Sequence, residues 1–258
     1  MKVTLLQTDI IKGNTPKNLE HIDEMLSSLR RGDTDLVVLP EMFHCGFTFD
    51  PNAVAESGSD IAIAWMQKKA EQLNAHICGS VSFPHDSKWY NRLVVAAPNG
   101  DLTTYDKRHL FTMGNEPIVY TAGRDRVVVT IAGVRILLQV CYDLRFPVFS
   151  RYNGDYDAIV YVANWPASRR EAWNILLKAR AIENQCYVIG VNRVGNDDMI
   201  RYSGDSVLIS PRGKVEVPTE AYKEEMVTAE VDLEALQSFR SKFRVLDDRD
   251  LFTINEAQ

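Results

Sequence analysis

Short apolar runs rich in β-branched residues alternate along this chain with segments that carry apolar residues at helical spacing. We expect strands at 2–8, 35–39, 76–83, 93–97, 102–105, 127–131, 134–140, 157–163, 186–192, 206–210, 214–217 and 226–231, and helices at 14–29, 60–74, 169–184 and 233–242. In the second of these helices we expect Ile61, Ala64, Trp65 and Leu73 to face inward. Turn sequences such as Pro98-Asn99-Gly100 join neighbouring strands into antiparallel hairpins.

Interleaved strands and helices together with hairpins predict an α/β fold with mixed sheets, whose outer faces are covered by helices. The sequence contains no internal repeat, low-complexity segment or linker. We therefore expect a single domain over residues 1–258, with a polar tail from about Arg244. Hydrophobic residues make up 45% of the chain, which is enough for a large core.

The net charge limits the class of binding partner, and the cysteines indicate the cellular compartment. A formal net charge of −6 gives no electrostatic basis for binding nucleic acid or an anionic membrane. No apolar stretch approaches the ~20 residues that a membrane span needs, and the first residues show no signal-peptide pattern. The four cysteines form no Cys-x-x-Cys pair, so we expect reduced thiols and a cytoplasmic protein.

Cys141 directly follows the buried strand predicted at 134–140 and precedes polar residues. A strand end holds a sulfur atom rigidly, and the following turn offers backbone N–H groups, that of Tyr142 first, to a developing oxyanion. This position is typical of a nucleophile. Taken alone, however, Cys141 is better explained as a structural cysteine, because free cysteine is among the most buried residue types.

Glu41 and Lys107 also lie just past predicted strand ends, where sites form in α/β folds. A free thiol is mostly protonated at neutral pH, so a nucleophilic Cys141 needs a base, and a buried carboxylate serves as one. A lysine ammonium stabilises the oxyanion of a tetrahedral intermediate. Taken singly, Glu41 and Lys107 are better explained as solvated loop residues.

Three sequence blocks around these residues resemble the signature blocks of the nitrilase superfamily of carbon–nitrogen hydrolases, in the same order. They are Leu39-Pro40-Glu41-Met42-Phe43, Tyr105-Asp106-Lys107-Arg108-His109-Leu110-Phe111 and Val140-Cys141-Tyr142-Asp143-Leu144-Arg145-Phe146-Pro147. Two further blocks, at 179–185 and 203–213, also match, and the resemblance runs from the first strand to about residue 232. The resemblance implies a four-layer α-β-β-α sandwich, pairing into at least a dimer, and no metal or organic cofactor.

The resemblance also implies roles for individual residues. Glu41 would be the general base and acid, Lys107 the oxyanion stabiliser and Cys141 the nucleophile. The family often has a second glutamate after the lysine block. Glu116 is the only acidic residue between Lys107 and Asp125, and it is our candidate for a supporting role.

The blocks around Cys141 and Asn164-Trp165-Pro166-Ala167-Ser168-Arg169 look most like the ω-amidase branch. That branch hydrolyses the terminal amide of 2-oxo dicarboxylic monoamides such as 2-oxoglutaramate and 2-oxosuccinamate. The substrate carboxylate would need a cation, for which the candidates are Arg145, Arg169 and Arg170. For Arg145 we favour instead a structural ion pair with Asp143. Phe43, Tyr142 and Trp165 are candidate walls of the pocket.

Other functions remain as alternatives. One is a different amidase or a carbamoyl-amide hydrolase of the same superfamily, and another is a non-catalytic binding subunit with this fold. A zinc hydrolase would need ligands from His76, Cys78 and other scattered residues, whose spacing matches no common zinc motif. A cysteine–histidine enzyme would use His109 as the base.

Overall fold

The computed structural model describes residues 1–48, 50–55, 57–197 and 200–254. The first sheet contains β1 (Lys2–Gln7), β2 (Leu36–Val38), β3 (His76–His85), β4 (Lys88–Ala96), β5 (Leu102–Asp106) and β14 (Glu225–Glu230), in the order β14-β1-β2-β3-β4-β5. The second contains β6 (Val128–Ile131), β7 (Val134–Val140), β8 (Ala158–Ala163), β9 (Tyr187–Asn192), β12 (Val207–Ile209) and β13 (Val215–Pro218), in the order β13-β12-β9-β8-β7-β6. A separate ribbon pairs β10 (Val194–Asp197) with β11 (Ile200–Ser203).

Both sheets have the same plan. Three central strands are parallel, β1-β2-β3 in one sheet and β7-β8-β9 in the other, and the flanking strands are antiparallel. The predicted hairpins β4–β5, β6–β7 and β12–β13 are confirmed. Since the parallel strands of one sheet all end at the same edge, the residues that follow β2 lie at an edge of the first sheet and those that follow β7 at an edge of the second. The packing of the two sheets against each other decides whether these two edges share one site.

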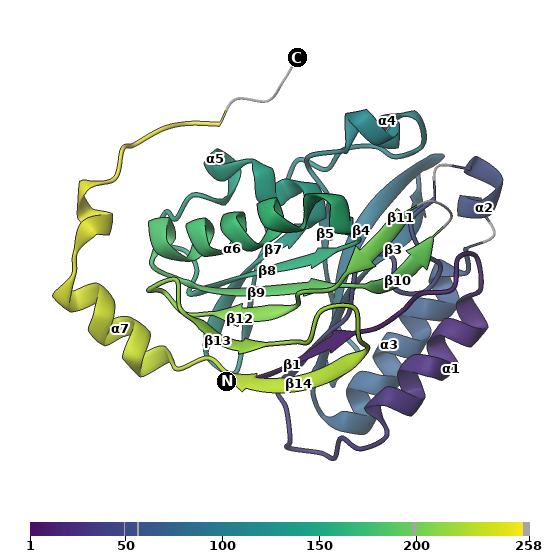
Figure 1. Ribbon diagram of the computed structural model, residues 1–258, viewed down its shortest axis with the longest axis horizontal. Coiled ribbons are helices and arrows are strands. Elements are labelled where there is room, and N and C mark those ends of the chain that lie inside the picture. Colours follow the sequence, from purple (N-terminus) through teal and green to yellow (C-terminus); the bar gives the residue numbers. More distant parts are fainter. Residues whose placement is uncertain (49, 56, 198–199, 255–258) are drawn as a thin grey trace.

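The helices are α1 (Thr15–Leu26), α2 (Pro51–Ala55), α3 (Ser59–Leu73), α4 (Glu116–Val119), α5 (Pro147–Ser150), α6 (Arg170–Asn184) and α7 (Leu233–Lys242). Short 3-10 turns are η1 (Thr112–Gly114), η2 (Cys141–Arg145), η3 (Ala167–Arg169) and η4 (Val245–Asp248). In Figure 1, α1 and α3 cover one sheet and α6 covers the other, while α7 and the segment after it extend from the body.

Three apolar layers hold these elements together. One cluster fills the space between the sheets, where Leu5 and Val38 meet Ile136 and Val160. A second lies between the first sheet and α1 and α3, and a third between the second sheet and α6. This is the predicted four-layer α-β-β-α sandwich with mixed sheets.

Helix α3 presents a different face to the sheet from the one that we predicted. Ala62, Met66, Ala70 and Leu73 are buried, whereas the side chain of Ile61 is 55% exposed and Ala64 is also exposed. The prediction of Ile61 and Ala64 as inward residues was therefore wrong. Ala62, Met66, Ala70 and Leu73 recur every three or four residues and form one buried stripe of the helix, and Ile61 lies outside that stripe.

No helix in the described ranges combines the length and the apolar character that crossing a bilayer requires.

Candidate active site

Glu41, Lys107 and Cys141 come together at one edge of the sandwich. Glu41 lies just beyond β2, Lys107 directly follows β5, and Cys141 directly follows β7 of the opposite sheet. All three line a cavity of about 140 Å³. The complete lining is Glu41, Phe47, Lys107, Phe111, Gly114, Cys141, Tyr142, Arg145, Asn164, Trp165, Pro166, Arg169, Ile200 and Tyr202.

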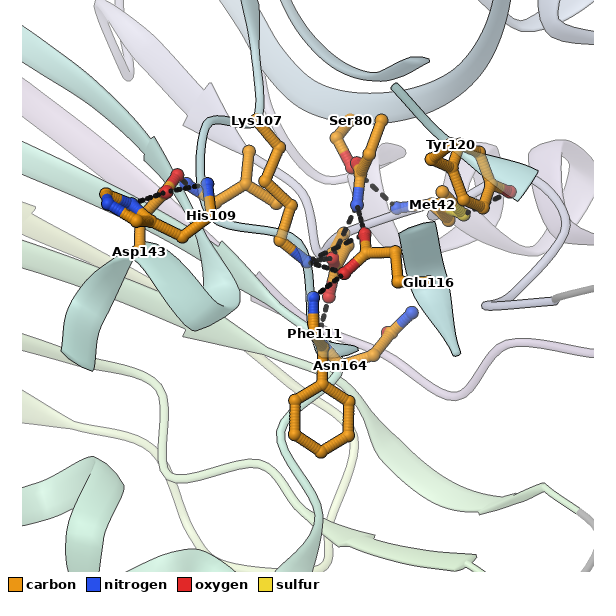
Figure 2. A network of polar contacts seen from close by, with 12 residues as sticks. Met42, Ser80, Lys107, His109, Phe111, Glu116, Tyr120, Asp143 and Asn164 are labelled. Carbon is orange, nitrogen blue, oxygen red and sulfur yellow. Dashed lines mark hydrogen bonds and ion pairs between the residues drawn. The ribbon is translucent and has the colours of Figure 1, made fainter. Parts of the chain in front are cut away.

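The ammonium of Lys107 lies between two buried carboxylates. Its Nζ is 3.0 Å from Oε1 of Glu41. It is also 3.0 Å from both carboxylate oxygens of Glu116, as Figure 2 shows. All three side chains are at most 1% exposed. Two negative groups around one positive group leave the buried cluster with a formal excess of negative charge.

Backbone and amide donors stabilise that excess negative charge. Asn91 Nδ2 donates to Oε1 of Glu41 at 2.7 Å and to Oε1 of Glu116 at 3.3 Å, so one side chain bridges the two carboxylates. The N–H of Asn164 donates to Oε2 of Glu41, and that of Phe111 donates to Oε2 of Glu116. Asn91 was not predicted as a site residue, because a lone asparagine two residues before the strand predicted at 93–97 carries no local sign of a role in a site.

Cys141 adopts a left-handed backbone conformation, with φ at +44°, as the chain leaves β7 and enters η2. For a residue with a Cβ this conformation costs on the order of 1–2 kcal/mol, so the surrounding contacts must hold it. Asp143 supplies them by accepting hydrogen bonds from the N–H of Val140, the Tyr105 hydroxyl and the N–H of His109. Tyr142 lies in the first turn of η2, where N–H groups have no intrahelical acceptor.

Asp143 therefore does not pair with Arg145, and our prediction of that ion pair was wrong. The carboxylate of Asp143 faces Tyr105 and His109 at the exit of β5, as Figure 2 shows for His109. The Arg145 guanidinium lies 5.0 Å from the centre of the Trp165 ring and lines the cavity. It has no acidic partner among the described residues.

Of the other residues predicted for the pocket, some line the cavity and some do not. Tyr142 and Trp165 line the cavity, together with Phe47, Phe111 and Tyr202, which the sequence did not single out. Arg169 lines it as well, with its guanidinium 5.1 Å from the centre of the Phe111 ring.

Arg170, by contrast, turns away from the cavity and forms a bidentate ion pair with Asp205. Phe43 was wrongly predicted as a pocket wall. It is fully buried between the first sheet and its helices, above Gly79, where an added Cβ would lie 2.8 Å from its ring.

The residues weighed for other mechanisms lie outside this cavity. His109 bonds to Asp143 through Nδ1 and stacks on Phe146, and it is not among the lining residues. In the described part of the chain, no three His, Cys, Asp or Glu side chains gather in a way that could hold a metal ion.

Burial and charge set the protonation of the cluster. Burial is the largest influence on Lys107 and lowers its pKa, but the charges of Glu116 and Glu41 outweigh it and raise the pKa above its ordinary value. Burial also raises the pKa of Glu116, against the opposing effect of Lys107. The pKa of Cys141 is raised well above its ordinary value by burial and by the charge of Glu41, and Lys107 only partly offsets this. The resting site therefore contains a thiol and an ammonium.

We predict that the resting enzyme shows no Cys141 thiolate below pH 9.0, the ordinary value from which its pKa is raised. A raised thiol pKa keeps the proton bound through the neutral range. The measurement is the pH titration of thiolate ultraviolet absorbance, taken as the difference between the wild type and Cys141→Ala. The difference cancels Cys45, Cys78 and Cys186, and a thiolate step near neutral pH would contradict the prediction.

Comparison with known proteins agrees with this geometry. The model of the carbon–nitrogen hydrolase family matches residues 2–241. The omega-amidase YafV of Escherichia coli K12 is 45% identical over 255 residues, covering 98% of each chain, and a 2-oxoglutaramate amidase of Bacillus subtilis is 32% identical, covering 97% of this chain and 98% of its own.

A solved structure supports the same assignment. XC1258 from Xanthomonas campestris, a CN-hydrolase superfamily protein with an arsenic adduct in its active site, superposes with a TM-score of 0.93 at 40% identity and 99% coverage of both chains. The resemblance found in the sequence is confirmed, and this chain belongs to the carbon–nitrogen hydrolase family.

Proposed function

We propose that this protein is an ω-amidase. It hydrolyses the terminal amide of small 2-oxo dicarboxylic monoamides, such as 2-oxoglutaramate or 2-oxosuccinamate, to the 2-oxo acid and ammonia. The observation that carries the proposal is that one small cavity is lined by the Glu41–Lys107–Cys141 cluster and by the guanidinium groups of Arg145 and Arg169. A reactive end and a cationic end suit an amide that also bears a carboxylate. The similarity to the omega-amidase and the 2-oxoglutaramate amidase supports this substrate class.

In the proposed first half-reaction, Glu41 takes the proton of Cys141 as the sulfur attacks the amide carbon and a C–S bond forms. The oxyanion accepts hydrogen bonds from the Lys107 ammonium and the Tyr142 N–H. Glu41 then gives the proton to the nitrogen, the C–N bond breaks, and ammonia leaves a thioester on Cys141. Glu116 keeps Lys107 in place and charged.

In the second half-reaction, water attacks the thioester carbon while Glu41 takes a proton from the water. The C–S bond breaks, the 2-oxo acid leaves, and the proton on Glu41 returns to Cys141. The carbonyl oxygen of the amide and that of the thioester accept hydrogen bonds from the same donors. One site therefore stabilises both tetrahedral intermediates. No metal or organic cofactor takes part in either half-reaction.

We further propose that the enzyme works as a homodimer or larger homo-oligomer in the cytoplasm. Val148 on α5 and Ile175 and Ile182 on α6 are exposed apolar side chains, which favours their burial against a second copy. The four free cysteines suit a reducing compartment. We expect analytical ultracentrifugation to give at least twice the monomer mass for the wild type, and the monomer mass for a double Ile175→Asp, Ile182→Asp variant. A monomeric wild type would refute the proposed assembly.

The substrate proposal predicts rapid ammonia release from 2-oxoglutaramate and 2-oxosuccinamate, and slow release from glutamine, a carbamoyl amino acid and a simple nitrile. Cys141→Ala should fold normally and lose turnover, because no other group replaces the nucleophile. Release from another panel member alone would place the enzyme among the other amidases or carbamoyl-amide hydrolases. A folded wild type that is silent on every amide would favour the non-catalytic reading.

The cationic end predicts that Arg169→Ala raises KM for 2-oxoglutaramate about 10- to 100-fold, since a hydrogen bond to a charged group contributes roughly 1.5–3 kcal/mol. Hydrolysis of an uncharged amide of similar length should change little. Arg170→Ala is the matched control, because its guanidinium pairs with Asp205 outside the cavity. Equal effects of the Arg169 change on charged and uncharged amides would argue against carboxylate binding there.

A further inference from the structure

The side chain of Asn164 is a buried amide without a partner. The residue is 7% exposed, and neither Oδ1 nor Nδ2 has a hydrogen-bond partner among the described residues. No dashed line reaches this side-chain amide in Figure 2. Leaving a buried polar group unpaired costs free energy, and native proteins satisfy nearly all such groups. An unpaired amide in a native fold therefore points to a group that binds there during function.

The position of Asn164 distinguishes it from other buried polar groups that lack partners. His44, Gln139 and Tyr161 also carry unpaired atoms, but they do not line the cavity that holds Cys141. Of the described residues with such atoms, Asn164 is the one that does. A molecule bound in the active-site cavity can therefore supply the missing partner of this amide.

The backbone of Asn164 is held firmly next to the catalytic carboxylate. It directly follows β8, and its N–H donates to Oε2 of Glu41 at 2.8 Å. The next residue, Trp165, exchanges two hydrogen bonds with the side-chain amide of Asn192, at 2.8 and 3.0 Å. Asn164 thus belongs to a firmly held segment beside the carboxylate of Glu41, the group proposed to protonate the leaving nitrogen.

We propose that Oδ1 of Asn164 accepts a hydrogen bond from the terminal –NH2 group of the substrate, which makes Asn164 the residue that selects unsubstituted amides. This inference rests on the proposed function. A primary amide has one carbonyl oxygen and two N–H groups. The oxygen is directed to Lys107 and the Tyr142 N–H, one N–H faces Glu41, and the second faces Asn164.

This contact holds the nitrogen in place while Glu41 protonates it and the C–N bond breaks. Asn164 itself neither gains nor loses a proton. An N-alkyl amide would place a methyl group where the second N–H lies, and the Asn164 oxygen would remain unpaired. Asn164 thereby makes the enzyme prefer substrates that release ammonia. This preference is separate from recognition of the acyl chain, which Arg145 and Arg169 provide.

The test compares an amide with an ester that forms the same acyl-enzyme: 2-oxoglutaramate and the 5-methyl ester of 2-oxoglutarate. Methanol as the leaving group offers no N–H to Asn164. We expect Asn164→Ala and Asn164→Leu to lower kcat/KM for the amide about 10- to 100-fold and to change that for the ester by no more than about threefold. The preference for the primary amide over its N-methyl derivative should fall in parallel.

Gln139→Ala is the matched control, because Gln139 is a buried amide with an unpaired oxygen that lies outside the cavity. It should leave the ratio of amide to ester hydrolysis unchanged, even where it lowers stability. Equal losses on amide and ester in the Asn164 variants would overturn the inference and indicate a structural role, as would an unchanged amide rate.

Failure of the proposed function gives a different result. If the wild type hydrolyses another amide instead, the same comparison is made with the amide and the methyl ester of that acyl group. The ratio of amide to ester hydrolysis in the Asn164 variants then tests the inference. If the folded wild type hydrolyses no amide, both the proposed function and this inference are refuted.

Discussion

The ion cluster of Lys107 with Glu41 and Glu116 is the interaction on which the site depends. An ammonium and two carboxylates that are almost fully buried would each be costly alone, and they are tolerated because each is paired and hydrogen-bonded. Asn91 and the N–H groups of Asn164 and Phe111 complete the set of donors. This arrangement keeps Lys107 charged and Glu41 oriented before any substrate arrives, which is the preorganisation that electrostatic stabilisation requires.

The sandwich places this cluster in one cavity with Cys141 of the opposite sheet. Glu41 and Lys107 follow strands of the first sheet, whereas Cys141 follows β7 of the second. Asp143 joins the two sides, because it caps the turn at Cys141 and accepts hydrogen bonds from Tyr105 and His109 at the end of β5. Positive φ angles at Cys141 and at Met42, the residue after Glu41, show that both turns are held in uncommon conformations. The packed sheets on either side supply the contacts that maintain them.

The cavity divides the proposed recognition between two kinds of polar group. Arg145 and Arg169 lie against the faces of Trp165 and Phe111, which keeps their guanidinium groups oriented without neutralising them. Asn164 lies on the side of Glu41 and is neutral, so it suits an amide –NH2 group rather than a carboxylate. Acyl-chain recognition and leaving-group recognition can therefore change independently of the catalytic cluster.

The sequence by itself determined most strands and helices along the chain, three hairpins, the α/β layering and the positions of Glu41, Lys107 and Cys141 at or near strand ends. These depend on local periodicity, turn residues and short motifs, which are written in consecutive residues. Only the tertiary structure decided which side chains face the cavity. Phe43 lies over Gly79 in the core while Phe47 lines the cavity, Asp143 bonds across the sheets rather than to Arg145, and Asn91 and Asn164 meet Glu41 from distant strands. Such contacts join residues tens to more than a hundred positions apart, so their partners are set by how the two sheets pack and not by any local pattern.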